Sequence, residues 1–166
     1  MAHGVVRTDL LAGTDVRSEL VSVRYQPSDT MTDIDNGNVV LLGDLEDGSR
    51  TVYKGGTPAA NSDLKDIALV ASPEVIYDEH IHGLDKYYNE AGKISRGYRL
   101  HKKDIFSVTI DALDAASDPE VGNIVELQAG TKLKVVSSAT SSTTTVGEII
   151  DINVVGRYTY YVVEVQ

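Results

Sequence analysis

The fold is decided by two runs near the end of the chain, Val146-Gly147-Glu148-Ile149-Ile150-Asp151-Ile152-Asn153 and Tyr158-Thr159-Tyr160-Tyr161-Val162-Val163-Glu164-Val165. Both are rich in β-branched and aromatic residues, which favour strands because they fit a pleated, half-buried surface. Similar runs precede them at 121–127 and 132–136, and turn-forming residues separate the runs at regular intervals. Such spacing is typical of a meander, a sandwich or a small barrel.

The strand pattern continues toward the N-terminus. The Asp47-Gly48 pair lies between the β-prone runs 38–45 and 50–54, and it predicts a hairpin because glycine takes φ > 0 without strain. Residues 67–71 form a short apolar run, which indicates a strand buried on both faces. Further strands are predicted at 21–25, 97–100 and 105–109.

Helical signals are few. Apolar residues recur at 4-3-4-3 spacing up to Ala91, and we expect a short helix over about 84–91 that stops at Gly92. Thr109 is expected to cap a helical turn over 110–116. The predicted fold class is therefore mainly β, a small β-barrel or β-sandwich with one or two short helices and an extended N-terminal arm.

The first 20 residues differ from the rest because they show no sustained apolar period. We expect an N-terminal arm that is mobile unless it docks on a partner. The chain has 166 residues, which is the length of one domain. The predicted organisation is an arm at 1–20 and a single β-rich domain at 21–166.

Composition excludes several classes of function. The net charge of −10 argues against a nucleic-acid partner, because phosphate binding depends on lysine and arginine. The absence of cysteine rules out disulfides and thiolate zinc sites. No apolar run approaches the ~20 residues that span a bilayer, so we expect no membrane partner.

The sharpest candidate for a metal site is 78–85, Asp-Glu-His-Ile-His-Gly-Leu-Asp, where alternating histidines would share one face of a strand. Without a spaced third ligand, a solvated acidic loop is the favoured interpretation. The acidic pairs also lack the spacing of a calcium loop: Asp33/Asp35, Glu46/Asp47 and Asp78/Glu79. No nucleophile elbow or phosphate loop occurs, and Gly55-Gly56 is interpreted as a turn. We expect no metal, no cofactor and no enzymatic activity.

A basic stretch interrupts this acidic chain. Residues 93–103, Lys-Ile-Ser-Arg-Gly-Tyr-Arg-Leu-His-Lys-Lys, contain no acidic residue. Such a patch could steer docking onto an acidic protein surface. A solvated strand-turn-strand explains the same residues equally well.

The order of several segments resembles that of the small capsid decoration, or cement, proteins of tailed bacteriophages. The segments are the polar arm, Ile34-Asp35-Asn36-Gly37-Asn38-Val39-Val40, Ala91-Gly92-Lys93-Ile94-Ser95-Arg96-Gly97-Tyr98-Arg99-Leu100, Asp104-Ile105-Phe106-Ser107-Val108-Thr109 and Gly130-Thr131-Lys132-Leu133. The resemblance implies a protein that binds the major capsid protein on the assembled shell, often as a homo-oligomer. It also implies a location on the virion exterior, after synthesis in the host cytoplasm.

Decoration proteins commonly use a terminal arm in the contact with the shell. The resemblance therefore implies contact residues in the arm, with the basic stretch as a supplement: Val5, Arg7, Leu10 and Leu11, then Arg96, Arg99, Lys102 and Lys103. Three alternatives stay open: a tail or head-tail connector component, a carbohydrate-binding surface module favoured by the tyrosines, and, last, a small enzyme.

Overall fold

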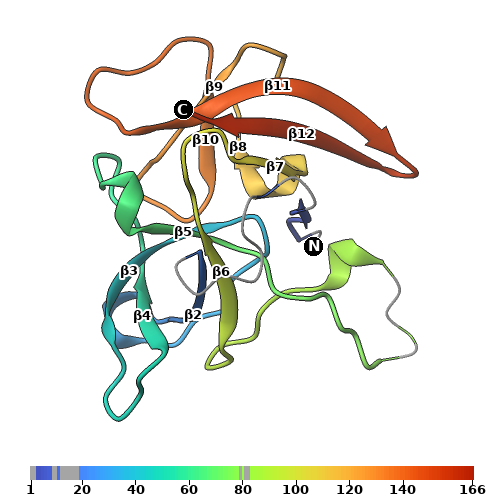
Figure 1. Ribbon diagram of the computed structural model, residues 1–166. Helices are drawn as coiled ribbons and strands as arrows, with labels where there is room; N and C mark the ends of the chain where they lie inside the picture. Colours follow the sequence, from blue (N-terminus) through green and yellow to red (C-terminus); the bar gives the residue numbers. More distant parts are fainter. Residues whose placement is uncertain (1–2, 9–10, 12–18, 79, 81–82) are drawn as a thin grey trace.

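The computed structural model describes residues 3–8, 11, 19–78, 80 and 83–166. The fold is mainly β, as the sequence predicts, with a closed barrel drawn below a larger sheet in Figure 1. Short 3-10 turns lie between the strands, at Pro27–Asp29 (η1), Leu64–Asp66 (η2), Leu84–Lys86 (η3) and Ile110–Ala112 (η4). The barrel strands, in order of pairing, are β2 (Leu20–Tyr25), β4 (Val52–Gly56), β3 (Val39–Leu45), β5 (Ile67–Val70) and β6 (Ser95–Arg99).

The second unit is a seven-stranded sheet. Its strands, in order across the sheet, are β1 (Val6–Arg7), β7 (Ile105–Val108), β12 (Tyr158–Val165), β11 (Thr145–Val155), β9 (Ile124–Glu126), β10 (Leu133–Val136) and β8 (Leu113–Asp114). Both edge strands, β1 and β8, are two residues long. The barrel is closed and these two edge strands are short, so neither side of the sheet ends in a long unpaired strand.

Strand β5 connects the two units. Ala68 and Val70 belong to the apolar cluster inside the barrel, whereas Ile67 and Leu69 belong to the cluster shared with the sheet. All four side chains are buried completely. The prediction that this run is buried on both faces is confirmed, since side chains alternate across a strand and each face of β5 has its own core.

The hairpin predicted around Asp47-Gly48 is also confirmed, because β3 pairs with β4 and Gly48 has φ of +78°. The interpretation of Gly55-Gly56 as a turn is wrong, since both residues lie in β4. A Cβ atom on Gly55 would lie 2.6 Å from the Val23 side chain. Glycine there permits close approach of neighbouring strands.

The helix predicted at 84–91 is wrong beyond its first turn, which is η3. Asn89 instead forms an isolated antiparallel bridge with Ile34, so tertiary contacts determine the conformation after that turn. The helical turn predicted over 110–116 is limited to η4, and β8 begins at Leu113. Thr109 precedes η4 but does not cap it, because its hydroxyl accepts a hydrogen bond from the Val5 amide at 3.1 Å.

The predicted arm is corrected for the residues that the structure describes. Strand β1 pairs with β7, and the amide of Thr109 donates to the carbonyl of Val5 at 2.9 Å. Val5, Val6 and Leu11 are buried. A two-residue strand is too short to show a period, so no sequence pattern predicts it. Figure 1 shows the N-terminal segment beside β7, where β1 forms one edge of the seven-stranded sheet.

Candidate functional site

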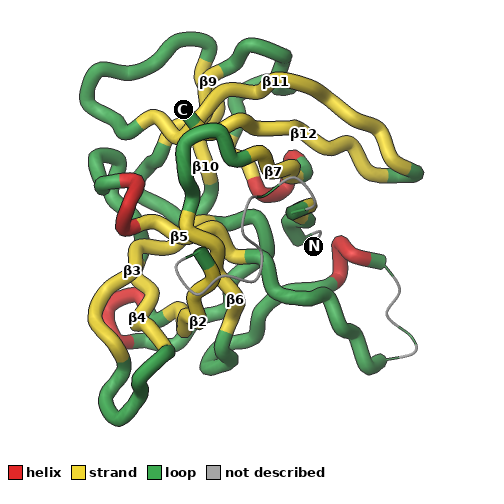
Figure 2. Tube along the Cα trace, in the orientation of Figure 1, coloured by secondary structure: helices red, strands yellow, loops and turns green. Residues whose placement is uncertain are grey.

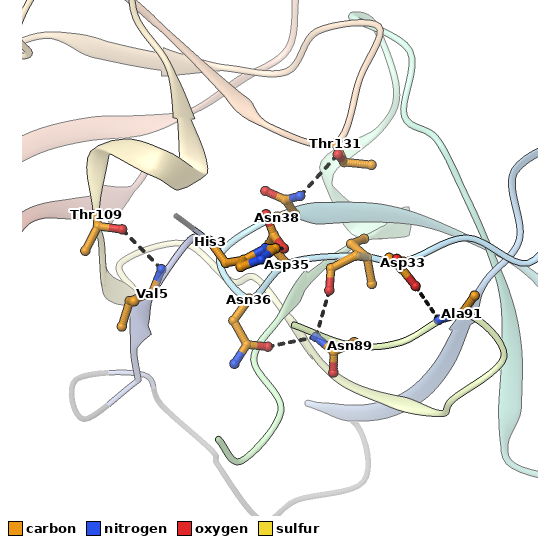
Figure 3. Close-up of polar contacts among 11 residues, drawn as sticks. His3, Val5, Asp33, Asp35, Asn36, Asn38, Asn89, Ala91, Thr109 and Thr131 are labelled. Carbon is orange, nitrogen blue, oxygen red and sulfur yellow. Dashed lines mark hydrogen bonds and ion pairs between the residues drawn. The ribbon is translucent and has the colours of Figure 1, made fainter. Parts of the chain in front are cut away.

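A buried polar network fixes the loop that precedes β3 (Figure 3). The Asn36 side-chain amide donates to the carbonyl of Ser72 at 2.8 Å, and its oxygen accepts from the Ser72 amide at 2.9 Å. The Asn89 side chain donates to the Asn36 oxygen and to the carbonyl of Ile34, both at 3.1 Å. The long connection between β5 and β6 is therefore anchored at both ends on residues 34–36 (Figure 2).

The N-terminal segment is attached to this network through His3. Its Nδ1 lies 2.8 Å from an Asp35 oxygen, its ring stacks on Tyr88 with centroids 5.0 Å apart, and its amide donates to the carbonyl of Asp85. A histidine oriented by a carboxylate can serve as a general base. Within the described residues, Nε2 of His3 has no hydrogen-bonded nucleophile. The contacts of His3 with Asp35, Tyr88 and Asp85 hold residues 3–8 in place.

The hairpin of β11 and β12 extends beyond the sheet (Figure 1). Strand β9 pairs with β11 only at Thr145–Glu148, and β7 pairs with β12 only at Tyr161–Glu164. The outer residues, 153–160, pair only with each other within the described sheet. We call the segment 150–160 the finger.

The finger ends in apolar side chains. Val154 is 71% exposed and Val155 is 51% exposed, and they face opposite sides because they are neighbours on a strand. Ile150, at the base, is 40% exposed. Gly156, with φ of +61°, begins the turn back into β12. None of these residues contributes to the core of this chain, so the tip is available to a partner.

One side of the finger is fixed to η3 through Asp85. Tyr158 donates its hydroxyl proton to Asp85 Oδ1 at 2.8 Å, and the Arg157 guanidinium forms an ion pair with the same carboxylate. The hydrogen bond from Tyr158, followed by contacts with Lys86 and Arg157, lowers the pKa of Asp85 below its ordinary value. Closer to the sheet, the Arg7 guanidinium lies 5.4 Å from the centroid of the buried Tyr160 ring. These contacts hold the finger in a defined direction.

A cavity of about 590 Å³ opens beside this region, between the two ends of the β5–β6 connection. Its lining combines tyrosine rings, aliphatic side chains and charged groups, and we call it the tyrosine pocket: Val75, Ile76, Tyr77, Asp78, Lys86, Tyr87, Tyr88, Asn89, Glu90, Lys93 and Ile94. Tyr77 is 93% exposed. Partial burial raises the pKa of Tyr87, whose hydroxyl donates to Asn89 Oδ1 at 3.3 Å.

The contact residues predicted in the arm are not brought together as an exposed surface. Val5 and Leu11 are 1% and 8% exposed, which contradicts their assignment as contacts presented by a free arm. Arg7 is partly buried over Tyr160. Leu10 lies outside the described residues. The physical reason is that the backbone of residues 5–7 forms its hydrogen bonds with β7 and Thr109 of the same chain, which packs this segment against the sheet.

The basic candidates are exposed or half-buried but divided between elements. Arg96 and Arg99 belong to β6 and, three residues apart, point to opposite faces of the strand. Arg99 lies 5.7 Å from the Tyr53 ring centroid, whereas Arg96 is exposed. Lys102 and Lys103 lie in the turn before β7, where Lys103 is paired with Glu164 at 2.7 Å. These residues do not form one patch.

The acidic stretch 78–85 is only partly covered, because Glu79 and His82 lie outside the described residues. His80 is exposed, and its amide donates to Asp78 Oδ1 at 2.9 Å. Among the residues that the structure describes, no group of three or more His, Asp or Glu side chains could hold a metal ion. No described helix is long and apolar enough to cross a membrane.

Sequence reasoning missed the finger tip and the tyrosine pocket. The available signal for the tip was the pair Val154-Val155 directly before Gly156, where two exposed apolar residues adjoin a turn. For the pocket, it was the recurrence of tyrosine at 77, 87 and 88 in a segment without a strand pattern. Neither signal reveals exposure, which depends on the pairing of distant strands.

Comparison of the chain with protein-family models, with curated proteins and with solved structures finds no match.

Proposed function

We propose that this chain is a non-catalytic virion structural protein that binds the outer surface of the assembled capsid of a tailed phage and stabilises the shell. The observation that carries the proposal is the finger, which projects from the sheet and ends in exposed Val154 and Val155 (Figure 1). Apolar side chains at a projecting tip mark protein contacts, because burying them in a partner removes their surface from water. The major capsid protein is proposed as the partner because the order of segments in this chain resembles that of capsid decoration proteins.

The rest of the fold supports a role in contact. The barrel is closed and the sheet ends in short edge strands, so the exposed side chains of the finger tip are the proposed means of binding. At the turn of the finger, Arg157 and Tyr158 contact Asp85 of η3. These contacts reduce the conformational freedom of the finger, so binding loses less entropy than it would with a flexible loop. Lys102, in an exposed turn, is proposed as a supplementary contact for an acidic shell.

In this proposal several copies decorate one virion, and each folds in the host cytoplasm before it binds. A ligand that prefers the closed shell over free subunits stabilises the shell in proportion to that preference. Decorated shells should therefore tolerate more heat or osmotic shock than bare ones.

The test is co-sedimentation of the purified chain with bare assembled shells, with free capsid subunits and with isolated tails. The proposal predicts saturable binding to shells and much weaker binding to free subunits. Binding to tails alone would overturn it in favour of the tail or connector alternative. Equal binding to shells and free subunits would remove the stabilising role.

A further inference from the structure

The tyrosine pocket has features that the finger and the proposed capsid contact do not explain. Its volume of about 590 Å³ lies within the range of small-molecule sites, about 300–1,000 Å³. The wall at 86–94 is fixed, since the Asn89 side chain is bonded to residues 34 and 36, and Tyr88 stacks on His3. That wall can bind a ligand without first having to be ordered.

The most exposed wall of the pocket is aromatic. Tyr77 is 93% exposed, so nearly its whole ring is open to solvent, and Tyr88 is 37% exposed on the same pocket. A tyrosine ring offers an apolar face together with a polar tip. Rings placed in this way suit a ligand that is flat and apolar on one face and still carries polar groups at its rim.

The remaining lining supplies hydrogen-bonding groups of both kinds. Asp78 and Glu90 carry carboxylates that accept, and Lys93 carries an ammonium group that donates. Both signs of charge are present, so the lining does not favour a strongly anionic or strongly cationic ligand. A neutral ligand with many hydroxyl groups, which donate and accept at once, satisfies both.

We infer that the tyrosine pocket is a binding site for a neutral saccharide, with the Tyr77 ring as its stacking face. A hexose has an apolar face of C–H groups and a rim of hydroxyls, which matches an exposed ring bordered by Asp78, Glu90 and Lys93. The inference goes beyond the capsid contact and does not depend on it. A particle coated with this chain would then present many weak saccharide sites, whose combined avidity exceeds that of one site.

The experiment is an amide NMR titration of the full chain with maltotriose, cellotriose, chitotriose and lactose at millimolar concentration. At least one saccharide should give saturable shifts confined to residues 75–78 and 86–94. The substitution Tyr77→Ala should weaken that binding by roughly three- to tenfold, the worth of one aromatic contact. The fold should be retained because this ring is almost fully exposed.

The matched control is Val121→Ala, which removes an exposed apolar side chain outside both the pocket and the finger and should leave saccharide binding unchanged. The inference is overturned if none of the four saccharides shifts the pocket residues. It is also overturned if binding occurs but Tyr77→Ala does not weaken it. Because the assay uses free protein, its result is independent of whether the chain binds capsids.

Discussion

Replacing both valines of the finger tip by threonine should weaken capsid binding without unfolding the chain. Threonine has nearly the shape and the β-branching of valine, so the double variant Val154→Thr, Val155→Thr keeps the strand preference of the tip. The change places a hydroxyl where the account expects an apolar contact. Surface substitutions of this kind alter the free energy of unfolding by about 0.5 kcal/mol or less.

The expected loss follows from the exposure of the two side chains. Val154 is 71% and Val155 is 51% exposed, so together they offer about one whole valine side chain to a partner. Burying such a side chain contributes about 1.5–3 kcal/mol. Threonine keeps one of the two methyl groups, so each substitution removes part of this gain and adds the cost of burying a hydroxyl without a partner, about 1–3 kcal/mol. We expect the dissociation constant for shells to rise at least tenfold, by about 1.4 kcal/mol or more.

The assay is co-sedimentation with bare shells over a range of protein concentrations, with Val121→Thr as the matched control. Val121 is 58% exposed but lies outside the finger. The control should bind as the unmodified chain does. If the double variant and the control bind shells equally well, the finger does not make the contact and the reasoning is refuted.

Three further predictions concern the fold and the contact between the finger and Asp85. Leu69→Ala, in the core shared by barrel and sheet, should lower the free energy of unfolding by about 2–5 kcal/mol in urea denaturation, and a loss below about 1 kcal/mol would contradict the shared core. Gly37→Ala should destabilise the fold more than Gly48→Ala, because both glycines have positive φ but only at Gly37 would the new Cβ meet another side chain, at 2.7 Å. Equal melting temperatures of the two variants would count against the described packing. The pKa of Asp85 is lowered in the folded chain, so the bond with Tyr158 should stabilise the fold above the ordinary aspartate pKa, and this stabilisation should be lost as pH falls through the lowered pKa. NMR titration of the Tyr158 ring checks this, and a ring signal without an acid transition would contradict it.

The parts of the fold that could be predicted are those whose signal is local. The run 67–71 is apolar at successive positions, so it needs a core on both sides whatever its neighbours are. The Asp47-Gly48 turn is likewise fixed by backbone conformation within a few residues. Mainly β structure follows from many such runs together.

The parts that failed depend on partners distant in sequence. Val5 is buried because its amide bonds to Thr109 and the next two residues pair with β7. No pattern within residues 1–20 reveals these distant partners. The apolar spacing around 84–91 suits a helix, but the bridge between Asn89 and Ile34 requires an extended backbone. The finger was predicted only as two strands, since its exposure results from where β7 and β9 stop pairing.

The capsid proposal is tested by electron cryomicroscopy of the virion to which we propose that this chain belongs. We expect density for this chain on the outer surface of the shell, with the tip around Val154 in contact with the major capsid protein. A well-resolved shell with no density for this chain, or density for it only on the tail, would show that the proposal is wrong.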